Sequence, residues 1–294
     1  MNHKTKGIIF ILLSAFSFAV MNAFVKLSGD LPSIQKSFFR NLVAVMFAVI
    51  ILLKSEEKLK FNRDNLKFLV IRSFFGTVGI LGNFYAVDHM VLSDASMLNK
   101  LSPFFAVIAS FFFLKEKVKP FQLAAVIAAF AGSLFIIKPT ASAFSDSLPA
   151  LVGLLGGLGA GIAYTTVRYL SKRGERGPFI VFFFSAFSCL VTLPFMIFDF
   201  RPMSLQQLSF LLLAGLAASG GQFAITAAYS HAPAREISVF DYTQVLFSAL
   251  LGFFLFGQIP DGWSLLGYII ICGISVAMFF YQSKEKQAPV KSEK

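Results

Sequence analysis

Long apolar stretches separated by short polar ones run through the whole chain. A membrane-spanning helix needs about 20 mostly apolar residues to cross roughly 30 Å of hydrocarbon. Segments that meet or approach this length predict ten spans, at 7–27, 33–53, 67–87, 94–114, 120–138, 149–170, 179–199, 207–229, 236–256 and 262–282. None has the alternating polarity of a barrel strand. The pattern therefore predicts an all-α polytopic membrane protein with ten transmembrane helices.

Composition agrees with a lipid environment. Hydrophobic residues make up 56% of the 294 residues and charged ones 14%, against roughly 45–50% and about 25% in soluble domains. Lys4 and Lys6 precede the apolar stretch Gly7 to Val25, which is longer than the ~7–15-residue core of a signal peptide. We expect this stretch to be a retained first span.

Basic residues gather at one set of span ends. Eighteen Lys and Arg lie at the ends that include the N-terminus, whereas the opposite ends carry four, namely Lys26, Lys36, Lys138 and Arg201. Lys and Arg accumulate in cytoplasmic loops, so both termini are expected in the cytoplasm. This asymmetry accounts for the net charge of +11 without a nucleic-acid partner.

The chain also matches itself. Residues 84–135 superpose on 226–277 without a gap, and a similar offset of 146 places Phe18 on Tyr164. Each copy would hold five spans, and an odd number inverts the second copy, a plan that recurs in secondary transporters. We predict two inverted five-helix repeats, 1–142 and 143–284, followed by a cytoplasmic tail, 285–294.

Two segments carry a resemblance to a known family. They are Gly76 to Val87 (GTVGILGNFYAV) and Asp94 to Lys117 (DASMLNKLSPFFAVIASFFFLKEK), with Leu-Ser-Pro at 101–103 and Glu116 after an apolar run. In these features the chain resembles the drug/metabolite transporter (DMT) superfamily, in its EamA-like family.

The second copy departs from that pattern, because Val245 replaces Pro103 and Gln258 replaces Glu116. The resemblance implies ten helices with both termini inside. It also implies a central cavity lined mainly by helices 1, 3, 4, 6, 8 and 9. Substrates in the family include amino acids, nucleotide-like metabolites, vitamins and toxic compounds, so the resemblance does not name one here.

Polar side chains inside the spans are candidate substrate contacts, because a charge in hydrocarbon costs several kcal/mol. Arg72 shares a helix face with Gly76, Gly79 and Asn83, and Pro103 can break the helix just after Lys100. The predicted substrate-binding residues are Arg40, Arg72, Asn83, Asn99, Lys100, Tyr164, Gln222, Asp241 and Gln244.

Each candidate has a structural alternative. Arg40 and Arg72 could extend to the membrane interface, and Lys100 could pair with an acid such as Asp94. Asp241, the only acid well inside a span, could neutralise a nearby cation, or bind a proton or a cationic amine. The glycines at 153, 157 and 161 favour close helix packing. The stretch Phe182 to Phe184 favours lipid contact or packing.

Arg40, Arg72 and Lys100 outnumber Asp241, which favours an amino-acid-like or organic-anion-like solute. We therefore predict a secondary transporter that moves a small polar metabolite by alternating access. Expected partners are this solute and the lipid bilayer, with protons as a coupling ion left open through Asp241. The sequence leaves open whether the chain is a monomer or a homodimer.

The alternative functions are export of cationic or amphipathic toxic compounds through Asp241 and, remotely, a membrane-embedded lipid enzyme. The sequence shows no catalytic cluster, metal set or cofactor motif, so no catalytic residue, metal or cofactor is predicted. Short loops and a Lys-rich composition favour a bacterial inner membrane.

Overall fold

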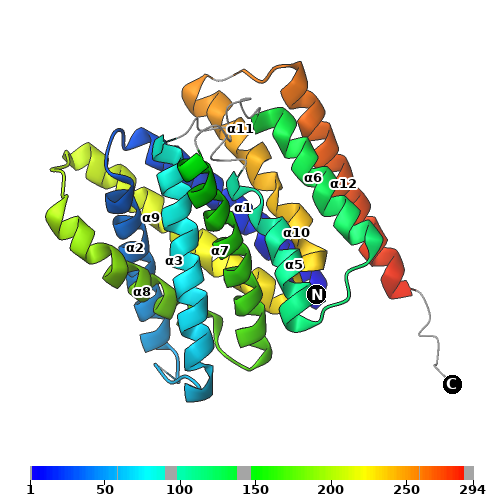
Figure 1. Ribbon diagram of the computed structural model, residues 1–294, viewed down its shortest axis with the longest axis horizontal. Helices are drawn as coiled ribbons and strands as arrows, with labels where there is room; N and C mark the ends of the chain where they lie inside the picture. The colour runs from blue at the N-terminus through cyan, green and yellow to red at the C-terminus, as the bar shows by residue number, and fades with distance from the viewer. Residues whose placement is uncertain (1, 58, 90–97, 138–146, 258, 288–294) are drawn as a thin grey trace.

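A computed structural model describes residues 2–57, 59–89, 98–137, 147–257 and 259–287. Over these residues the chain forms helices and no strand (Figure 1). The elements are α1 (His3–Leu27), α2 (Ser33–Lys54), η1 (Arg63–Asn65), α3 (Leu66–His89), α5 (Ser102–Leu114), α6 (Pro120–Ile137), α7 (Ser147–Lys172), α8 (Gly177–Phe198), α9 (Leu205–His231), α10 (Ala234–Asp241), α11 (Thr243–Phe256) and α12 (Gly262–Gln287).

These helices follow the predicted spans closely. In the described ranges, nine helical segments are long and apolar enough to cross a membrane, with α10 and α11 counted as one. The shorter apolar helix α5 lies in the predicted fourth span, whose first residues, including Asp94, fall outside the described part. The protein is thus an all-α polytopic membrane protein, as predicted.

The outer surface of the bundle is apolar. Phe112, Leu190, Phe254 and Ile269 are each about 70% exposed. A soluble protein would rarely expose so many large apolar side chains, whereas lipid tails accept them. The hydrocarbon of the membrane therefore covers this surface.

Helix packing repeats between the two parts of the chain. Helix α1 packs against α9, and α3 packs against α7, while α2 with α8 and α6 with α12 form the two edges (Figure 1). The helices α1 and α7 are five spans apart, and so are α3 and α9. Replacing each helix by its counterpart therefore converts the α1–α9 contact into the α7–α3 contact. The members of each edge pair are counterparts of each other, so these pairs stay the same. The arrangement is the one expected when two similar halves face each other.

The two histidines aligned by the repeat have the same local contact at opposite ends of the bundle. In α3, Nδ1 of His89 lies 2.9 Å from the carbonyl oxygen of Tyr85. In α9, Nδ1 of His231 lies 2.8 Å from that of Ala227. Helix α9 ends beside the start of α1, where the ring centroids of His231 and His3 lie 5.6 Å apart, and α3 ends at the opposite end of the bundle (Figure 1). This placement is consistent with an inverted second half.

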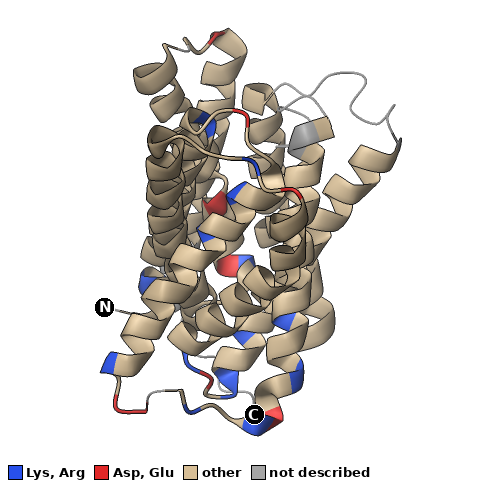
Figure 2. Cartoon of the chain, turned by 90° about the vertical axis from the view of Figure 1, so that its left-hand side faces the viewer, with Lys and Arg blue, Asp and Glu red and all other residues tan. Residues whose placement is uncertain are grey.

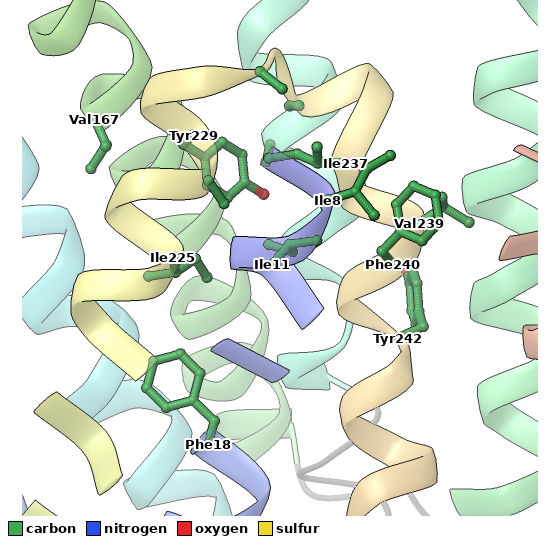
Figure 3. Close-up of a cluster of buried hydrophobic side chains, with 14 of the residues drawn as sticks. Ile8, Ile11, Phe18, Val167, Ile225, Tyr229, Ile237, Val239, Phe240 and Tyr242 are labelled. Atoms are coloured by element: carbon green, nitrogen blue, oxygen red, sulfur yellow. The ribbon is translucent and has the colours of Figure 1, made fainter. Parts of the chain in front are cut away.

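A buried apolar cluster holds α1 between α9 and α10. Ile8 and Ile11 of α1 contact this cluster together with Ile225, Tyr229 and Ile237 (Figure 3). Phe18 lies at its edge, further along α1. The cluster fixes the position of α1 and so places Phe18 at the centre of the bundle.

The end of the bundle where α1 begins and α12 ends is rich in Lys and Arg (Figure 2), and we call it the basic end. Here Glu116, after α5, lies 2.9 Å from Lys172 and 3.7 Å from Arg168 of α7. Lys4 of α1 lies 3.0 Å from Glu236 of α10. Further contacts between the parts of the chain are Arg176–Glu57 and Asn65–Glu175.

The opposite end is held differently. The side chain of Gln35 bonds to the backbone N–H and carbonyl of Arg201, and Gln207 donates to the carbonyl of Ser28. These are neutral hydrogen bonds. Over the ranges that the structure describes, the ion pairs of Glu57, Glu116 and Glu236 connect the two parts at the basic end.

Candidate functional site

Two helices are interrupted at equivalent places in the centre of the bundle. Helix α10 ends at Asp241, a turn at Tyr242 follows, and α11 begins at Thr243. In the first part of the chain, a turn at Lys100 and Leu101 precedes α5, which has Pro103 in its first turn. Proline supplies no backbone N–H to a helix, so the predicted break in span 4 is confirmed.

The breaks touch each other. The hydroxyl of Tyr242 donates a 3.0 Å hydrogen bond to the carbonyl oxygen of Lys100, a residue 142 positions earlier. This separation equals the offset of the internal repeat. A carbonyl left without a helical partner at one break is thus satisfied by a side chain from the other.

A cavity of about 120 Å³ lies beside these breaks. All of the predicted substrate-binding residues line it: Arg40, Arg72, Asn83, Asn99, Lys100, Tyr164, Gln222, Asp241 and Gln244. They come from α2, α3, the segment before α5, α7, α9, α10 and α11. The structure therefore brings the whole predicted set together, drawn from both parts of the chain.

Lys100 and Asp241 form a buried pair in this cavity. The Lys100 ammonium donates a 2.7 Å hydrogen bond to Oε1 of Gln244 and lies 3.8 Å from Oδ2 of Asp241. Both charged side chains are less than 10% exposed. Of the sequence alternatives, neutralisation of Lys100 by Asp241 has a direct geometric basis, while the alternative partner Asp94 lies outside the described residues.

Arg40 and Arg72 lie in the cavity, away from the membrane interface. They are 8% and 2% exposed. The guanidinium of Arg72 lies over the ring of Phe184 at 4.1 Å, and that of Arg40 lies over Phe18 at 5.8 Å. In both arginines the buried Nε atom has no hydrogen-bond partner, and no carboxylate of the described chain lies within ion-pair distance of either.

Glycine at position 76 makes room for Arg72. A Cβ atom there would overlap Nη1 of Arg72 and lie 2.7 Å from the ring of Phe184. The predicted stripe of Arg72, Gly76, Gly79 and Asn83 lines the cavity along its whole length. Gly76 thus gives the long guanidinium side chain its space, whereas Gly79 lets α3 lie close to Ala160 of α7.

The glycines of α7 serve packing, as predicted. A Cβ at Gly157 would lie 2.6 Å from the carbonyl oxygen of Leu98, and one at Gly161 would lie 2.6 Å from the Cβ of Phe105. These glycines let α7 approach the broken fourth helix closely.

Neutral hydrogen-bonding groups line other parts of the cavity. Tyr164 stacks on Tyr229 with ring centroids 5.1 Å apart. The buried Nε2 of Gln222 has no hydrogen-bond partner, and Gln244 accepts its bond from Lys100. An unpartnered buried amide is costly, so Gln222 is well placed to donate to a solute.

The cavity lining also includes residues outside the predicted set, among them Phe18, Ser102 and Phe184. Phe184 belongs to a stretch expected to face lipid or pack, and it is buried and packs against Arg72 in the cavity lining. Ser102 lies 142 positions before Gln244, and Phe18 lies 146 positions before Tyr164. The repeat offsets alone could have added Phe18 and Ser102, because their counterparts were already candidates.

Apolar helices around a small, buried polar cavity, with two helices broken beside it, define a membrane transport protein. Residues 5–138 and 147–281 both match the EamA-like transporter family. The chain belongs to this family, within the drug/metabolite transporter superfamily.

Named relatives are transporters. The chain is 34% identical to the pseudopaline exporter CntI of Pseudomonas aeruginosa (strain UCBPP-PA14), over 92% of this chain and 95% of the exporter. It is 26% identical to the riboflavin transporter of Vibrio cholerae, over 98% of this chain and 96% of that transporter. It is 25% identical to human solute carrier family 35 member G1, over 95% of this chain and 81% of that protein.

The fold also occurs among solved structures. One chain, titled "Crystal structure of protein", superposes with a TM-score of 0.80 over 94% of this chain and 98% of its own, at 13% identity. At this identity the likeness supports the fold alone.

Proposed function

We propose that the protein is a secondary transporter that moves a small polar metabolite bearing an anionic group. The solute would be amino-acid-like or organic-anion-like. The observation that carries the proposal is the pair Arg40 and Arg72, buried in one cavity with no carboxylate of the described chain within ion-pair distance of either. A buried cation without a partner is expensive, and a bound carboxylate or phosphate supplies one.

The arrangement of the helices supports alternating access as the mechanism. The halves 1–142 and 143–284 exchange equivalent contacts, and the cavity lies between them with a helix break on each side. Rocking one half against the other opens such a site to each side in turn. The basic end would face the cytoplasm of a bacterial inner membrane, with both termini on that side.

Other functions have less support. Export of cationic compounds would need a free carboxylate, but Asp241 is engaged with Lys100. A role as a lipid enzyme finds no catalytic arrangement among the lining residues. Proton coupling through Asp241 would require a proton to bind the same carboxylate that is paired with Lys100.

A thermal-shift screen tests the proposal. Purified protein is heated with amino acids, organic acids, phosphorylated metabolites and cationic amines, because a ligand of the native state raises the melting temperature. We expect stabilisation by anionic or zwitterionic solutes, lost in Arg72→Gln and kept in Gly273→Ala. Gly273 is a suitable control because a Cβ there meets nothing within 4 Å. Stabilisation only by cations, dependent on Asp241, would overturn the proposal.

Uptake and efflux of each stabilising solute in proteoliposomes then test transport directly. Solutes that bind without crossing the membrane would argue against a carrier.

A further inference from the structure

The charges around the cavity do not balance. Among the residues that the structure describes, four charged side chains line it: Arg40, Arg72, Lys100 and Asp241. Lys100 and Asp241 are close enough to neutralise each other. Arginine stays protonated in proteins. These four side chains therefore carry an excess of two positive charges.

Both excess charges come from the first part of the chain. The repeat offsets of 146 and 142 place Arg40 opposite Ala186 and Arg72 opposite Ala214. The second part instead contributes Tyr164, Gln222 and Gln244 to the lining. The first part thus supplies the cationic groups of the described lining, and the second part supplies Asp241 and neutral hydrogen-bonding groups.

The aromatic contacts leave the arginines their hydrogen-bonding capacity. Phe18 and Phe184 interact with the guanidinium groups of Arg40 and Arg72 through their ring faces, and such a contact uses none of the N–H donors. The planar guanidinium edge matches a carboxylate or phosphate with two parallel hydrogen bonds.

We infer that the site takes a solute carrying two negative charges, either a dicarboxylate or a phosphate monoester, with neutral polar groups at its other end. This inference rests on the proposed transport function and narrows its substrate class. A monoanion or a zwitterion would leave at least one buried guanidinium uncompensated, whereas a divalent anion neutralises both.

Matched solutes that differ only in charge test the inference. Dissociation constants are measured for purified protein with succinate, succinamate and succinamide, and with methyl phosphate and dimethyl phosphate. We expect the divalent member of one series to bind at least about tenfold more tightly than its monovalent analogue, a ratio that corresponds to about 1.4 kcal/mol. The two series separate carboxylate from phosphate recognition.

The variants Arg40→Gln and Arg72→Gln should each remove most of this charge preference, while Gly273→Ala should retain it. Sulfate against nitrate gives a further comparison that does not depend on the carbon skeleton. Equal affinity for divalent and monovalent members, or a preference that survives in both variants, would overturn the inference. Stabilisation by amino acids but by no divalent anion would also overturn the inference, but that result would agree with the proposed function. The proposed function itself would be contradicted if no solute raised the melting temperature and none were transported in proteoliposomes.

Discussion

Gly76 shows how a residue without a side chain can shape a charged site. Its Cα faces the guanidinium of Arg72 and the ring of Phe184. In Gly76→Ala, the added methyl must displace one of them, and the side chain of Arg72 has the greater freedom to move. We expect the affinity for an anionic solute to fall by about tenfold, which equals about 1.4 kcal/mol.

Calorimetric or thermal-shift titration of Gly76→Ala beside Gly273→Ala measures this effect. The control adds the same methyl where nothing lies within 4 Å. Unchanged anion affinity in Gly76→Ala would mean that Arg72 does not contact the solute.

The pair of Lys100 and Asp241 should behave as one unit. Removing one partner leaves the other as an uncompensated buried charge, which costs about 3–5 kcal/mol in general. Lys100→Gln and Asp241→Asn are each expected to destabilise the protein strongly, and the double variant by much less than their sum. Free energies of unfolding from chemical denaturation in detergent test this, and additive effects would show that the two groups do not interact.

At the scale of helices, the contact between the two breaks is a specific link. Tyr242→Phe removes the hydroxyl that donates to the carbonyl of Lys100 and leaves that buried carbonyl without this donor. We expect a loss of about 1 kcal/mol in unfolding free energy, and up to about 3 kcal/mol if no water replaces the bond.

Tyr268→Phe, in α12, is a matched control because it removes a hydroxyl from a side chain outside the cavity lining. Equal stability of Tyr242→Phe and this control would rule out a structural role for the bond between the breaks.

The helices could be predicted well because lipid imposes a simple rule on them: the apolar run must be long enough to span the membrane. The break in span 4 was also predictable, because Pro103 is a local signal. The break at Tyr242 carries no such signal, since Val245 stands where the first copy has proline. The structure shows that Tyr242 bonds there to the carbonyl of Lys100, a tertiary contact that has no local sequence signal.

The cavity residues were largely predictable for a related reason. Polar groups are rare inside spans, so Arg40, Arg72 and Asp241 stand out in the sequence. Phe184 does not, because aromatic residues are common throughout this chain. Its place beside Arg72 depends on how α8 packs against α3, and that packing has no local sequence signal.

At the scale of the whole molecule, ionic contacts connect the two halves at the basic end. Glu116 is 8% exposed and lies between α5 and α7, which belong to different halves. Glu116→Gln weakens its contacts with Lys172 and Arg168. We expect faster hydrogen exchange in the backbone of residues 114–120 and 168–176, because the two halves separate there more often.

Glu57→Gln provides the comparison. Glu57 also forms an ion pair between halves, with Arg176 at 3.1 Å, but its side chain is 65% exposed. Exposed pairs contribute little, typically below about 1 kcal/mol, so exchange should change little in this variant. Similar exchange in both variants would show that the basic end is not held by the buried Glu116.

The two excess positive charges of the cavity also have an electrical consequence. In the proposed alternating-access cycle, these fixed charges would change their position in the membrane field when the empty site opens to the other side, and each full charge corresponds to about 2.3 kcal/mol per 100 mV. A negative interior would therefore draw the empty site toward the cytoplasmic side. A site filled by a divalent anion is neutral and would cross the same field without cost. Net transport should thus respond to an imposed potassium diffusion potential, whereas one-for-one exchange should not.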